Sequence, residues 1–289
     1  MPRFSGKTVI ITGSSNGIGR SAALLFAQEG ANVTITGRNS DRLEETRQIL
    51  LKSGVPEKNI NSVVADVTTS SGQDQLINTT LAKFSKIDVL INNAGASIPD
   101  ATGATGIDQG IDIYQKTLQL NLQSVIEMTK KVKPHLIETK GEIVNISSIA
   151  GGSHAVSNFI SCFHEPNCFQ QPDFIYYSCA KSALDQFTRS SAIDLIKYGI
   201  RVNSVSPGVV ATGFIGAAGL DNEAAKKFYK HMAAHKECIP AGVAGQPEDI
   251  ATIILFLADR KLSSYIIGQS IVADGGSTLM MAMQFGDAM

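Results

Sequence analysis

The sequence has no excess of charge of either sign. Its 25 Lys and Arg residues balance 26 Asp and Glu residues, which leaves a net charge of −1. Because binding to nucleic acid or to an anionic membrane surface depends on an excess of positive charge, we expect neither partner. Long apolar runs are also absent, since no stretch of about 18 apolar residues, the length of a membrane-spanning helix, occurs.

Cysteine is scarce, with four residues among 289. Four is too few for a disulfide framework in a chain of this length, so we expect reduced thiols. A strand-like segment begins at Thr8, which leaves no room for a secretory signal and favours a cytoplasmic location. The composition, with 43% hydrophobic and 18% charged residues, excludes general disorder, because such a chain can bury a large core.

Short β-branched runs alternate with longer helical segments along the chain. The runs are apolar at nearly every position, as in strands that are buried on both faces of a parallel sheet. They cover 8–11, 32–36, 61–65, 87–91, 142–146, 200–205 and 270–273. Amphipathic helices are expected between them, at 17–30, 40–54, 70–85, 113–139, 175–198 and 247–258. This order predicts an α/β fold, a doubly wound parallel sheet of about seven strands with helices on both faces.

The chain shows no internal division. Linkers, charge runs and repeats are missing, so we expect 1–289 to form a single domain. Ser40 is expected to cap the second helix, and Pro247 to begin the last. Ligands of open α/β sheets bind beyond the carboxyl ends of the strands, where chain segments tend to be irregular. Segments that lack either periodicity follow three of the predicted strands, at 96–112, 149–174 and 209–222.

A glycine-rich turn joins the first predicted strand to the first predicted helix. Gly13 permits a tight turn, Gly17 lets backbone approach a phosphate, and Gly19 lets the helix pack closely on the strand. The alternative is a glycine-rich turn that binds no ligand. The position of this turn between a strand and a helix favours a dinucleotide site. After the second strand, Arg38 favours a 2′-phosphate over a ribose hydroxyl, because no carboxylate stands there. The alternative is a surface arginine, with discrimination made elsewhere.

Tyr177 and Lys181 are four residues apart in a predicted helix and share one of its faces. An ammonium beside a phenol lowers the phenol pKa toward the range of an acid–base catalyst. Such a pair on its own is common on protein surfaces. Ser148, after the fifth strand, is on its own a loop or cap residue. Asn121, whose amide competes for backbone bonds inside a predicted helix, has a structural or a functional role.

Together these features resemble the short-chain dehydrogenase/reductase family in its single-domain form, from about residue 4 to residue 276. The resemblance implies a Rossmann-type fold and an oxidoreductase that moves a hydride between a nicotinamide and a carbonyl or secondary alcohol. It rests on the Thr12–Gly19 turn, Asp66, Asn92-Asn93-Ala94-Gly95, Asn121, Ser148, Tyr177 with Lys181, Ser206-Pro207-Gly208 with Thr212, and Gly268-Gln269 with Asp274-Gly275-Gly276.

The resemblance implies four catalytic residues. Tyr177 would exchange a proton with the substrate oxygen, and Ser148 would hydrogen-bond that oxygen. Lys181 would lower the tyrosine pKa and hold the nicotinamide ribose, while Asn121 would position a water. Tyr177 is chosen over Tyr176 because it has a lysine four residues further on, and Ser148 follows from the register of the motif.

The resemblance also implies the cofactor-binding residues, with adenine near Asp66, phosphates at the glycine turn and nicotinamide near Pro207. The full set is Gly13, Ser14, Ser15, Asn16, Gly17, Ile18, Gly19, Arg38, Asn39, Asp66, Val67, Asn93, Ala94, Gly95, Tyr177, Lys181, Pro207, Gly208, Val210 and Thr212.

The long interval between Ser148 and Tyr177 departs from the family, in which it is usually short. We expect 152–174 to be an inserted lobe that narrows or lines the substrate pocket. The alternatives are an oligomer contact, a mobile segment, and a zinc site of His154, Cys162, His164 and Cys168, whose spacing matches no common zinc motif. Small residues before a helix predict a substrate lid at 209–238.

The sequence thus predicts an NADP(H)-dependent carbonyl reductase or alcohol dehydrogenase with a small-molecule substrate and no metal. We expect a homo-oligomer, a dimer or tetramer paired through helices 113–139 and 175–198. The apolar tail that begins at Leu279 either docks on a neighbouring subunit or has no fixed contact. The alternatives are an NAD-preferring alcohol dehydrogenase of the same family and a non-catalytic dinucleotide-binding protein.

Overall fold

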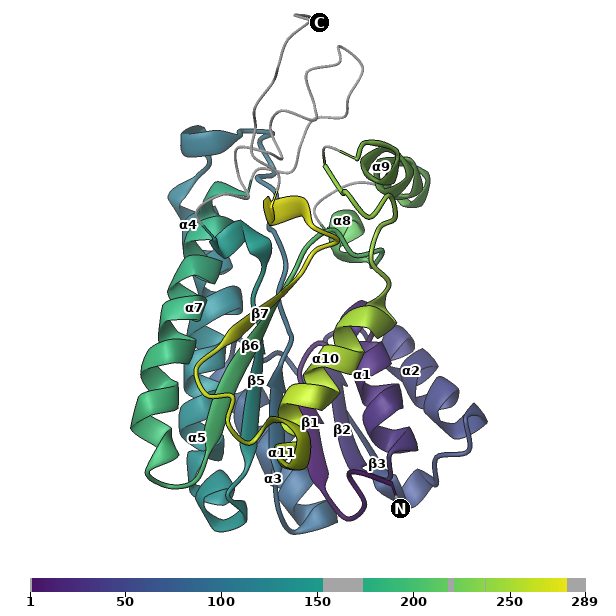
Figure 1. The fold of residues 1–289 in the computed structure, drawn as a ribbon, viewed down its shortest axis with the longest axis vertical. Coiled ribbons are helices and arrows are strands. Elements are labelled where there is room, and N and C mark those ends of the chain that lie inside the picture. Colours follow the sequence, from purple (N-terminus) through teal and green to yellow (C-terminus); the bar gives the residue numbers. More distant parts are fainter. Residues whose placement is uncertain (1, 153–173, 218–220, 237, 280–289) are drawn as a thin grey trace, which may run out of the picture.

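Seven parallel strands form one sheet in the order β3-β2-β1-β4-β5-β6-β7 (Figure 1). The computed structural model describes residues 2–152, 174–217, 221–236 and 238–279. The order reverses between β1 and β4, the kind of switch point at which open α/β sheets bind ligands. The strands are β1 (Thr8–Ile11), β2 (Asn32–Gly37), β3 (Ile60–Val64), β4 (Val89–Asn92), β5 (Glu142–Ile146), β6 (Arg201–Pro207) and β7 (Ser270–Ala273).

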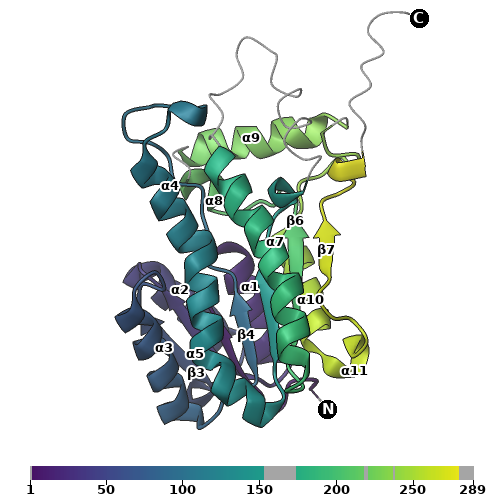
Figure 2. The ribbon, with the colours of Figure 1, turned by 90° about the vertical axis from the view of Figure 1, so that its left-hand side faces the viewer.

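Helices cover both faces of the sheet, as Figures 1 and 2 show together. One face carries α1 (Gly17–Gln28), α2 (Ser40–Lys52) and α10 (Pro247–Ala258). The other carries α3 (Ser70–Phe84), α5 (Ser124–Thr139) and α7 (Ile175–Ile196). Shorter helices join them, with α4 (Ile111–Leu118) before α5 and α11 (Arg260–Ser263) after α10. Beyond the carboxyl ends of the strands lie α8 (Phe214–Ala217) and α9 (Asn222–Ala234) (Figure 1).

The central strands are buried on both faces. In β1, Val9 and Ile11 pack into one core layer and Ile10 into the other, and all three are 0% exposed. Successive side chains of a strand point to opposite faces, so a strand covered on both sides must be apolar at every position. This confirms the predicted Rossmann-type sheet of about seven parallel strands.

Three local expectations are corrected. The helix expected at 113–139 is interrupted by a π-helical segment, Gln119–Gln123, which apolar periodicity does not reveal. Asn39, not Ser40, caps α2, because the extended backbone at Asn39 lets its side chain accept from the Arg42 N–H at 2.8 Å. Cys238 is disulfide-bonded whereas Cys179 is free. A single cross-link needs two thiols rather than a framework, so the low cysteine count did not exclude it.

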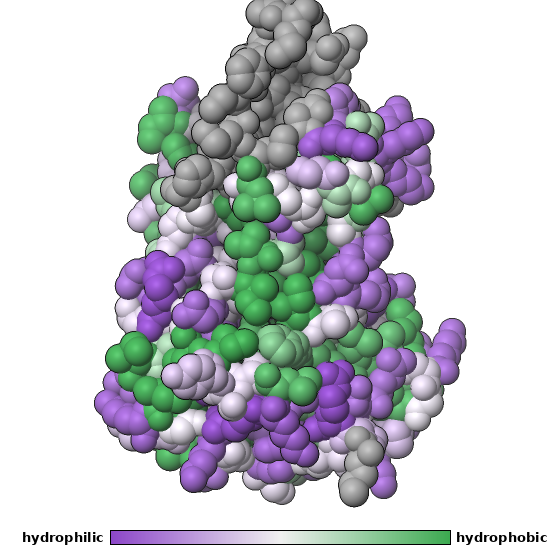
Figure 3. Space-filling model, viewed as in Figure 1, coloured by the Kyte–Doolittle hydropathy of each residue, from purple (hydrophilic) through white to green (hydrophobic). Residues whose placement is uncertain are grey.

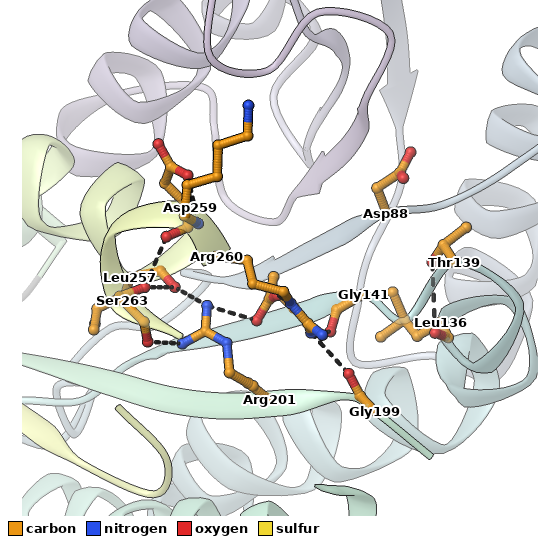
Figure 4. Close-up of polar contacts among 12 residues, drawn as sticks. Asp88, Leu136, Thr139, Gly141, Gly199, Arg201, Leu257, Asp259, Arg260 and Ser263 are labelled. Atoms are coloured by element: carbon orange, nitrogen blue, oxygen red, sulfur yellow. Dashed lines mark hydrogen bonds and ion pairs between the residues drawn. The ribbon is translucent and has the colours of Figure 1, made fainter. Parts of the chain in front are cut away.

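A buried ion cluster lies at the amino-terminal edge of the sheet (Figure 4). Arg201, the first residue of β6, lies 2.9 Å from Glu142 Oε2 and donates to the carbonyl oxygens of Ser263 and Leu257. Arg260 of α11 donates to Glu142 Oε1 at 2.6 Å. One carboxylate therefore ties β5 and β6 to the α10–α11 corner, at the end of the sheet opposite α8 and α9.

The face over the edge strand β7 is hydrophobic along its middle. Figure 3 shows a column of hydrophobic residues there, with hydrophilic residues on both sides. In β7 itself, Val272 is 50% exposed. None of the described helices is both long enough and apolar enough to cross a membrane.

Candidate active site

The glycine turn after β1 is packed against the chain that follows β4. Gly13 has a φ of +64°, and a Cβ at this position would lie 2.8 Å from the Cα of Ala94. A Cβ on Gly19 would lie 2.4 Å from Asn93 Nδ2. That amide donates to the carbonyl oxygens of Thr12 and Gly13 at 2.8 and 3.0 Å. The two glycines therefore let the turn, α1 and the β4 end close into one unit.

The first turn of α1 opens toward the cleft above this unit. Its N-cap residue, Asn16, makes no side-chain capping bond, whereas Asn39 caps α2 and Thr69 caps α3. The first N–H groups of a helix have no partner within the helix and carry a partial positive charge. This end of α1 therefore fits an anionic group such as a phosphate.

Two arginines lie between the end of β2 and the first turn of α2. Arg38 and Arg42 both line the cleft, and neither guanidinium has a hydrogen-bond or ion-pair partner among the described residues. Ser15 lies beside Gly37, since its Oγ lies 3.0 Å from where a Cβ of Gly37 would be, and it lines the same cleft. Arg20 of α1, by contrast, is engaged, because it donates to the Ser15 carbonyl oxygen at 2.6 Å and pairs with Glu45 of α2. The guanidinium groups of Arg38 and Arg42 are thus available to bind an anionic ligand in the cleft.

Tyr177, Ser148 and Lys181 come together at the carboxyl ends of the strands. Tyr177 is buried on the first turn of α7, and its hydroxyl is hydrogen-bonded to Ser148. Lys181 lies one turn on, with its Nζ 5.4 Å from the centroid of the Tyr177 ring. That Nζ donates to the carbonyl oxygen of Ile146, at the end of β5, at 2.7 Å. Tyr176 points elsewhere and donates to the Gln109 carbonyl oxygen.

Burial controls the ionisation of this cluster. It raises the pKa of the Tyr177 phenol above its ordinary value, and the Ser148 hydrogen bond opposes this. It lowers the pKa of Lys181 to about 8, and the carboxylate of Asp185 opposes that. In both cases the charged form loses its water. The pKa of Tyr177 is therefore raised rather than lowered as expected, because the desolvation of the phenol outweighs the effect of the nearby Lys181 ammonium.

Asn121 lies behind the cluster, fully buried in the π-helical segment. Its Nδ2 donates to the carbonyl oxygens of Ala96 and Thr117, both at 2.9 Å, and its Oδ1 accepts from the Ala96 N–H. A Cβ on Gly95 would lie 2.7 Å from Asn121 Oδ1 and 3.3 Å from Lys181 Nζ. Gly95 is thus the spacer that lets Asn121 and the lysine approach each other.

The turn that carries Ser148 is bonded directly to α7. It is a 3₁₀ turn, Ile149–Gly151, and the Gly151 carbonyl oxygen accepts from the Ser182 hydroxyl. A Cβ on Gly151 would lie 3.0 Å from Asp185 Oδ2. Ser147 is hydrogen-bonded to Asp185, whose pKa is raised by burial. These contacts bring the segments of Ser148 and Tyr177 together across the interval 149–176.

Aromatic rings surround the Tyr177 ring. The Phe214 centroid lies 5.4 Å and the Phe174 centroid 5.9 Å from that of Tyr177, both in edge-to-face geometry. Phe174 and Phe214 are nearly parallel, 8° apart, with centroids separated by 6.3 Å. Phe174 precedes α7, and Phe214 begins α8. The two rings therefore approach the candidate proton donor from two separate elements.

One cleft of about 1600 Å³ joins these parts. Among the predicted site residues, Ser14, Gly19 and Asn121 do not line it, and all the others do. Ser14 is buried and its hydroxyl donates to the Ile11 carbonyl oxygen, which braces the turn from behind. Within the described part of the chain, no group of three or more His, Cys, Asp and Glu residues could hold a metal ion. The zinc alternative and most of the inserted lobe lie outside the described residues.

Arg42 and Asp185 are absent from the prediction, and Phe174 and Phe214 were included only as members of the expected pocket segments 152–174 and 209–238. Arg42 follows Arg38 by four residues and lies in the first turn of α2, so helical spacing could have found it. Asp185 is likewise one helical turn beyond Lys181. Phe174 and Phe214 carry no local signal, because only the folded chain brings them to the same ring.

Similar proteins support the geometry. The family model described as enoyl-(acyl carrier protein) reductase matches residues 13–278. A crystal structure of a short-chain dehydrogenase/reductase of unknown function from Caenorhabditis elegans, with cofactor, is 70% identical and covers 99% of this chain and 100% of that one, with a TM-score of 0.91. The apo-form structure of a glucose dehydrogenase from the same organism is 58% identical, covers 96% and 99%, and has a TM-score of 0.78.

A more distant relative agrees with these. An uncharacterized oxidoreductase, YxbG, from Bacillus subtilis is 33% identical over 96% of this chain and 92% of its own. The fold and the matches, which span nearly the whole chain, point to the same family. The chain therefore belongs to the short-chain dehydrogenase/reductase family, a family of oxidoreductases that use nicotinamide dinucleotides.

Proposed function

We propose that the chain is an NADP(H)-dependent carbonyl reductase and alcohol dehydrogenase. The observation that carries this is the meeting of Tyr177, Ser148 and Lys181 in the same cleft as the open end of α1 and the free guanidiniums of Arg38 and Arg42. A proton donor and an anion-binding cradle in one cleft are what a carbonyl reductase needs. A non-catalytic dinucleotide-binding protein, the alternative, would not need Tyr177, Ser148 and Lys181 together in this cleft.

The residues present fit a dinucleotide. A Cβ at Gly13 or Gly19 would collide with the β4 end, and the uncapped first turn of α1 offers N–H groups to the pyrophosphate. Asp66 and Val67 would hold the adenine, and the Pro207–Val210 segment the nicotinamide, because all of them line the cleft. When bound, the nicotinamide donates a hydride to the carbonyl carbon, or accepts one from the alcohol.

The proton is handled by the chain's own residues. In reduction, the Tyr177 hydroxyl gives its proton to the carbonyl oxygen, so that the C=O bond becomes a C–OH bond. Ser148 donates a hydrogen bond to that same oxygen and polarises it. Lys181 stabilises the phenolate left behind, because its ammonium lies over the phenol ring. Asn121 holds the Ala96 segment and positions a water that returns a proton through Lys181.

Arg38 and Arg42 carry the preference for the phosphorylated cofactor. An unpaired guanidinium at the ribose end forms charge-assisted, bidentate hydrogen bonds with a 2′-phosphate and gains little from a hydroxyl. The NAD-preferring alternative would call for an acidic residue after β2, where Gly37, Arg38 and Asn39 stand.

We extend the proposal to the surroundings of the site. The segment 209–238, which carries α8 and α9, is the substrate lid, and 152–174 is the inserted lobe of a single domain. The chain is a cytoplasmic homo-oligomer that pairs through α5 and α7, where Ile193 is 73% exposed. Analytical ultracentrifugation of the wild type and of Ile193→Glu tests this pairing. If it is right, the variant should sediment as a species of lower mass than the wild type. Cell fractionation tests the location.

Steady-state kinetics with each cofactor test the central proposal. With a panel of ketones, the wild type should oxidise NADPH, and Arg38→Ala and Arg42→Ala should each raise the KM for NADPH about tenfold or more. The KM for NADH should change far less. Arg47→Ala is the matched control, because Arg47 pairs with Glu44 on the outer side of α2. Equal changes in the KM values of NADPH and NADH would reject the 2′-phosphate assignment. A lack of turnover with every ketone would reject the proposed carbonyl reductase activity.

A further inference from the structure

The wall beside Tyr177 is aromatic and apolar. Phe174 and Phe214 lie against the Tyr177 ring from two elements, and the apolar residues Ile149, Val209 and Ile215 line the same cleft. Ile215 and Phe228 belong to a small hydrophobic cluster against which Phe214 packs. The ring of Phe214 is thus backed by a core of its own and forms a fixed surface beside the reacting hydroxyl.

Three polar side chains of this wall are already engaged within the protein. The Tyr229 hydroxyl donates to the Thr212 carbonyl oxygen at 2.9 Å, and the Thr212 hydroxyl accepts from the Phe214 N–H. Asp221 caps α9 by accepting from the Ala224 N–H at 2.8 Å. In the described part of this wall, Ser178 alone has a buried hydroxyl without a partner. A substrate with several hydroxyls would lose water here and find few new partners for them.

Ring geometry favours a flat group over a branched one. The ring planes of Phe174 and Phe214 are nearly parallel, 8° apart. They make angles of 62° and 60°, respectively, with the plane of the Tyr177 ring. Aromatic rings prefer offset-stacked and edge-to-face partners, and such contacts add to the free energy gained by burying apolar area. A planar ring attached to the carbonyl carbon of a substrate would extend this stack of rings, while the carbonyl oxygen of that substrate reaches Tyr177 and Ser148.

We propose that the substrates of this site are ketones and secondary alcohols whose reacting carbon carries an aromatic or other flat apolar group, held by Phe174 and Phe214 beside Tyr177. This rests on the proposed function for the reaction itself. Reduction of such a ketone consumes one NADPH and one proton: a C–H bond forms at the carbonyl carbon, an O–H bond forms at its oxygen with the proton of Tyr177, and NADP⁺ is released.

Binding and turnover are measured separately, so that the two proposals can fail separately. Equilibrium binding of acetophenone and of dihydroxyacetone is measured on the Tyr177→Phe chain with NADPH, where no proton can be transferred from that position. Turnover of both ketones is measured on the wild type. The same measurements are made on Phe214→Leu and Phe174→Leu, and on Phe84→Leu as a matched control, because Phe84 does not line the cleft. Circular dichroism melts establish that each variant is folded.

We expect acetophenone to bind at least about tenfold more tightly than dihydroxyacetone. Phe214→Leu and Phe174→Leu should each lower the acetophenone to dihydroxyacetone ratio of kcat/KM by about three- to tenfold, and Phe84→Leu should leave it unchanged. Equal binding of the two ketones, or an unchanged ratio in both folded variants, would overturn the inference. Acetophenone binding that depends on Phe214, without turnover of any ketone by the wild type, would uphold the ligand class and reject the proposed reaction.

Discussion

The hydroxyl of Ser182 donates to the carbonyl oxygen of Gly151 across 2.8 Å. Ser182 follows Lys181 in α7, and Gly151 ends the turn that begins after Ser148. The two halves of the catalytic cluster are therefore fastened to each other through space. Their separation is set by this contact rather than by the length of the chain between them.

Gly151→Ala should misplace the cluster. An added Cβ would lie 2.8 Å from the Lys181 carbonyl carbon and 3.0 Å from the Ser182 nitrogen, so the turn and α7 must move apart. Small displacements of reacting groups cost about 10²-fold in rate. We expect kcat to fall by about that factor while the KM for NADPH stays within about twofold. Gly152→Ala is the control, because its Cβ meets only the Ile149 carbonyl oxygen, at 3.4 Å, and an equal loss in both variants would contradict the prediction.

Tyr177→Phe should abolish turnover without loss of cofactor binding. The change removes the hydroxyl that holds the transferred proton, and general acid catalysis contributes about 10² to 10⁴ in rate. Stopped-flow kinetics measure the loss, and NADPH fluorescence measures the Kd. Tyr176→Phe is the matched control, since the Tyr176 hydroxyl donates to Gln109 away from the cluster. Substantial turnover by Tyr177→Phe would remove this residue from the mechanism.

Asp185→Asn should shift the alkaline limb of the pH profile of kcat/KM to lower pH. Burial lowers the pKa of Lys181 to about 8, and the negative charge of Asp185 holds it from falling further. Without that charge the ammonium loses its proton at a lower pH, and the charge that stabilises the phenolate is lost with it. The groups that face Asp185 are Lys181, Arg189 and Ser147.

The control for this shift is Asp194→Asn on the same helix. Asp194 pairs with Lys197 at 2.9 Å on the exposed side of α7, so its loss should leave the pH profile in place. A profile that is identical in Asp185→Asn and the wild type would mean that Asp185 does not set the charge state of Lys181.

Glu142→Gln should destabilise the fold and leave catalysis intact. The carboxylate is buried between Arg201 and Arg260, and removing one partner of a buried ion pair costs about 3–5 kcal/mol because the remaining charge is left uncompensated. Urea unfolding measures the free energy of unfolding, and steady-state kinetics in the absence of urea measure kcat. A loss of kcat without a loss of stability would contradict the placement of this cluster away from the chemistry.

The sheet and the cofactor turn were predictable because local signals determine them. Apolar runs such as Val9–Ile11 report burial on both faces, and Gly13 and Gly19 stand where a side chain has no room. The helical spacing of Tyr177 and Lys181 predicted that they share one face of a helix, and the resemblance to the family implied their role. Each of these features is set by neighbours in the sequence.

The rest depends on contacts between distant segments. Phe214 and Phe174 meet at Tyr177 only after β6 and α7 pack side by side, and no sequence spacing encodes that meeting. The pKa of Tyr177 was predicted with the wrong sign, because helical spacing shows that a lysine is near but not how dry the phenol becomes. Asn39 replaced Ser40 as the cap because two adjacent polar residues compete for the same role, and only the backbone angles decide between them.

The π-helical segment has a consequence for how this chain tolerates change. A π turn holds one more residue than an α turn, so every residue of α5 is rotated by about 100° relative to an uninterrupted helix starting at α4. The additional residue thus shifts the phase of the helix. With this shift, the Asn121 side chain bonds the Ala96 backbone, and Met128 and Val132 lie on the core side of α5. Deleting one residue within 119–123 would cancel the phase shift. A helix of better geometry would then present the wrong side chains to both the cleft and the core.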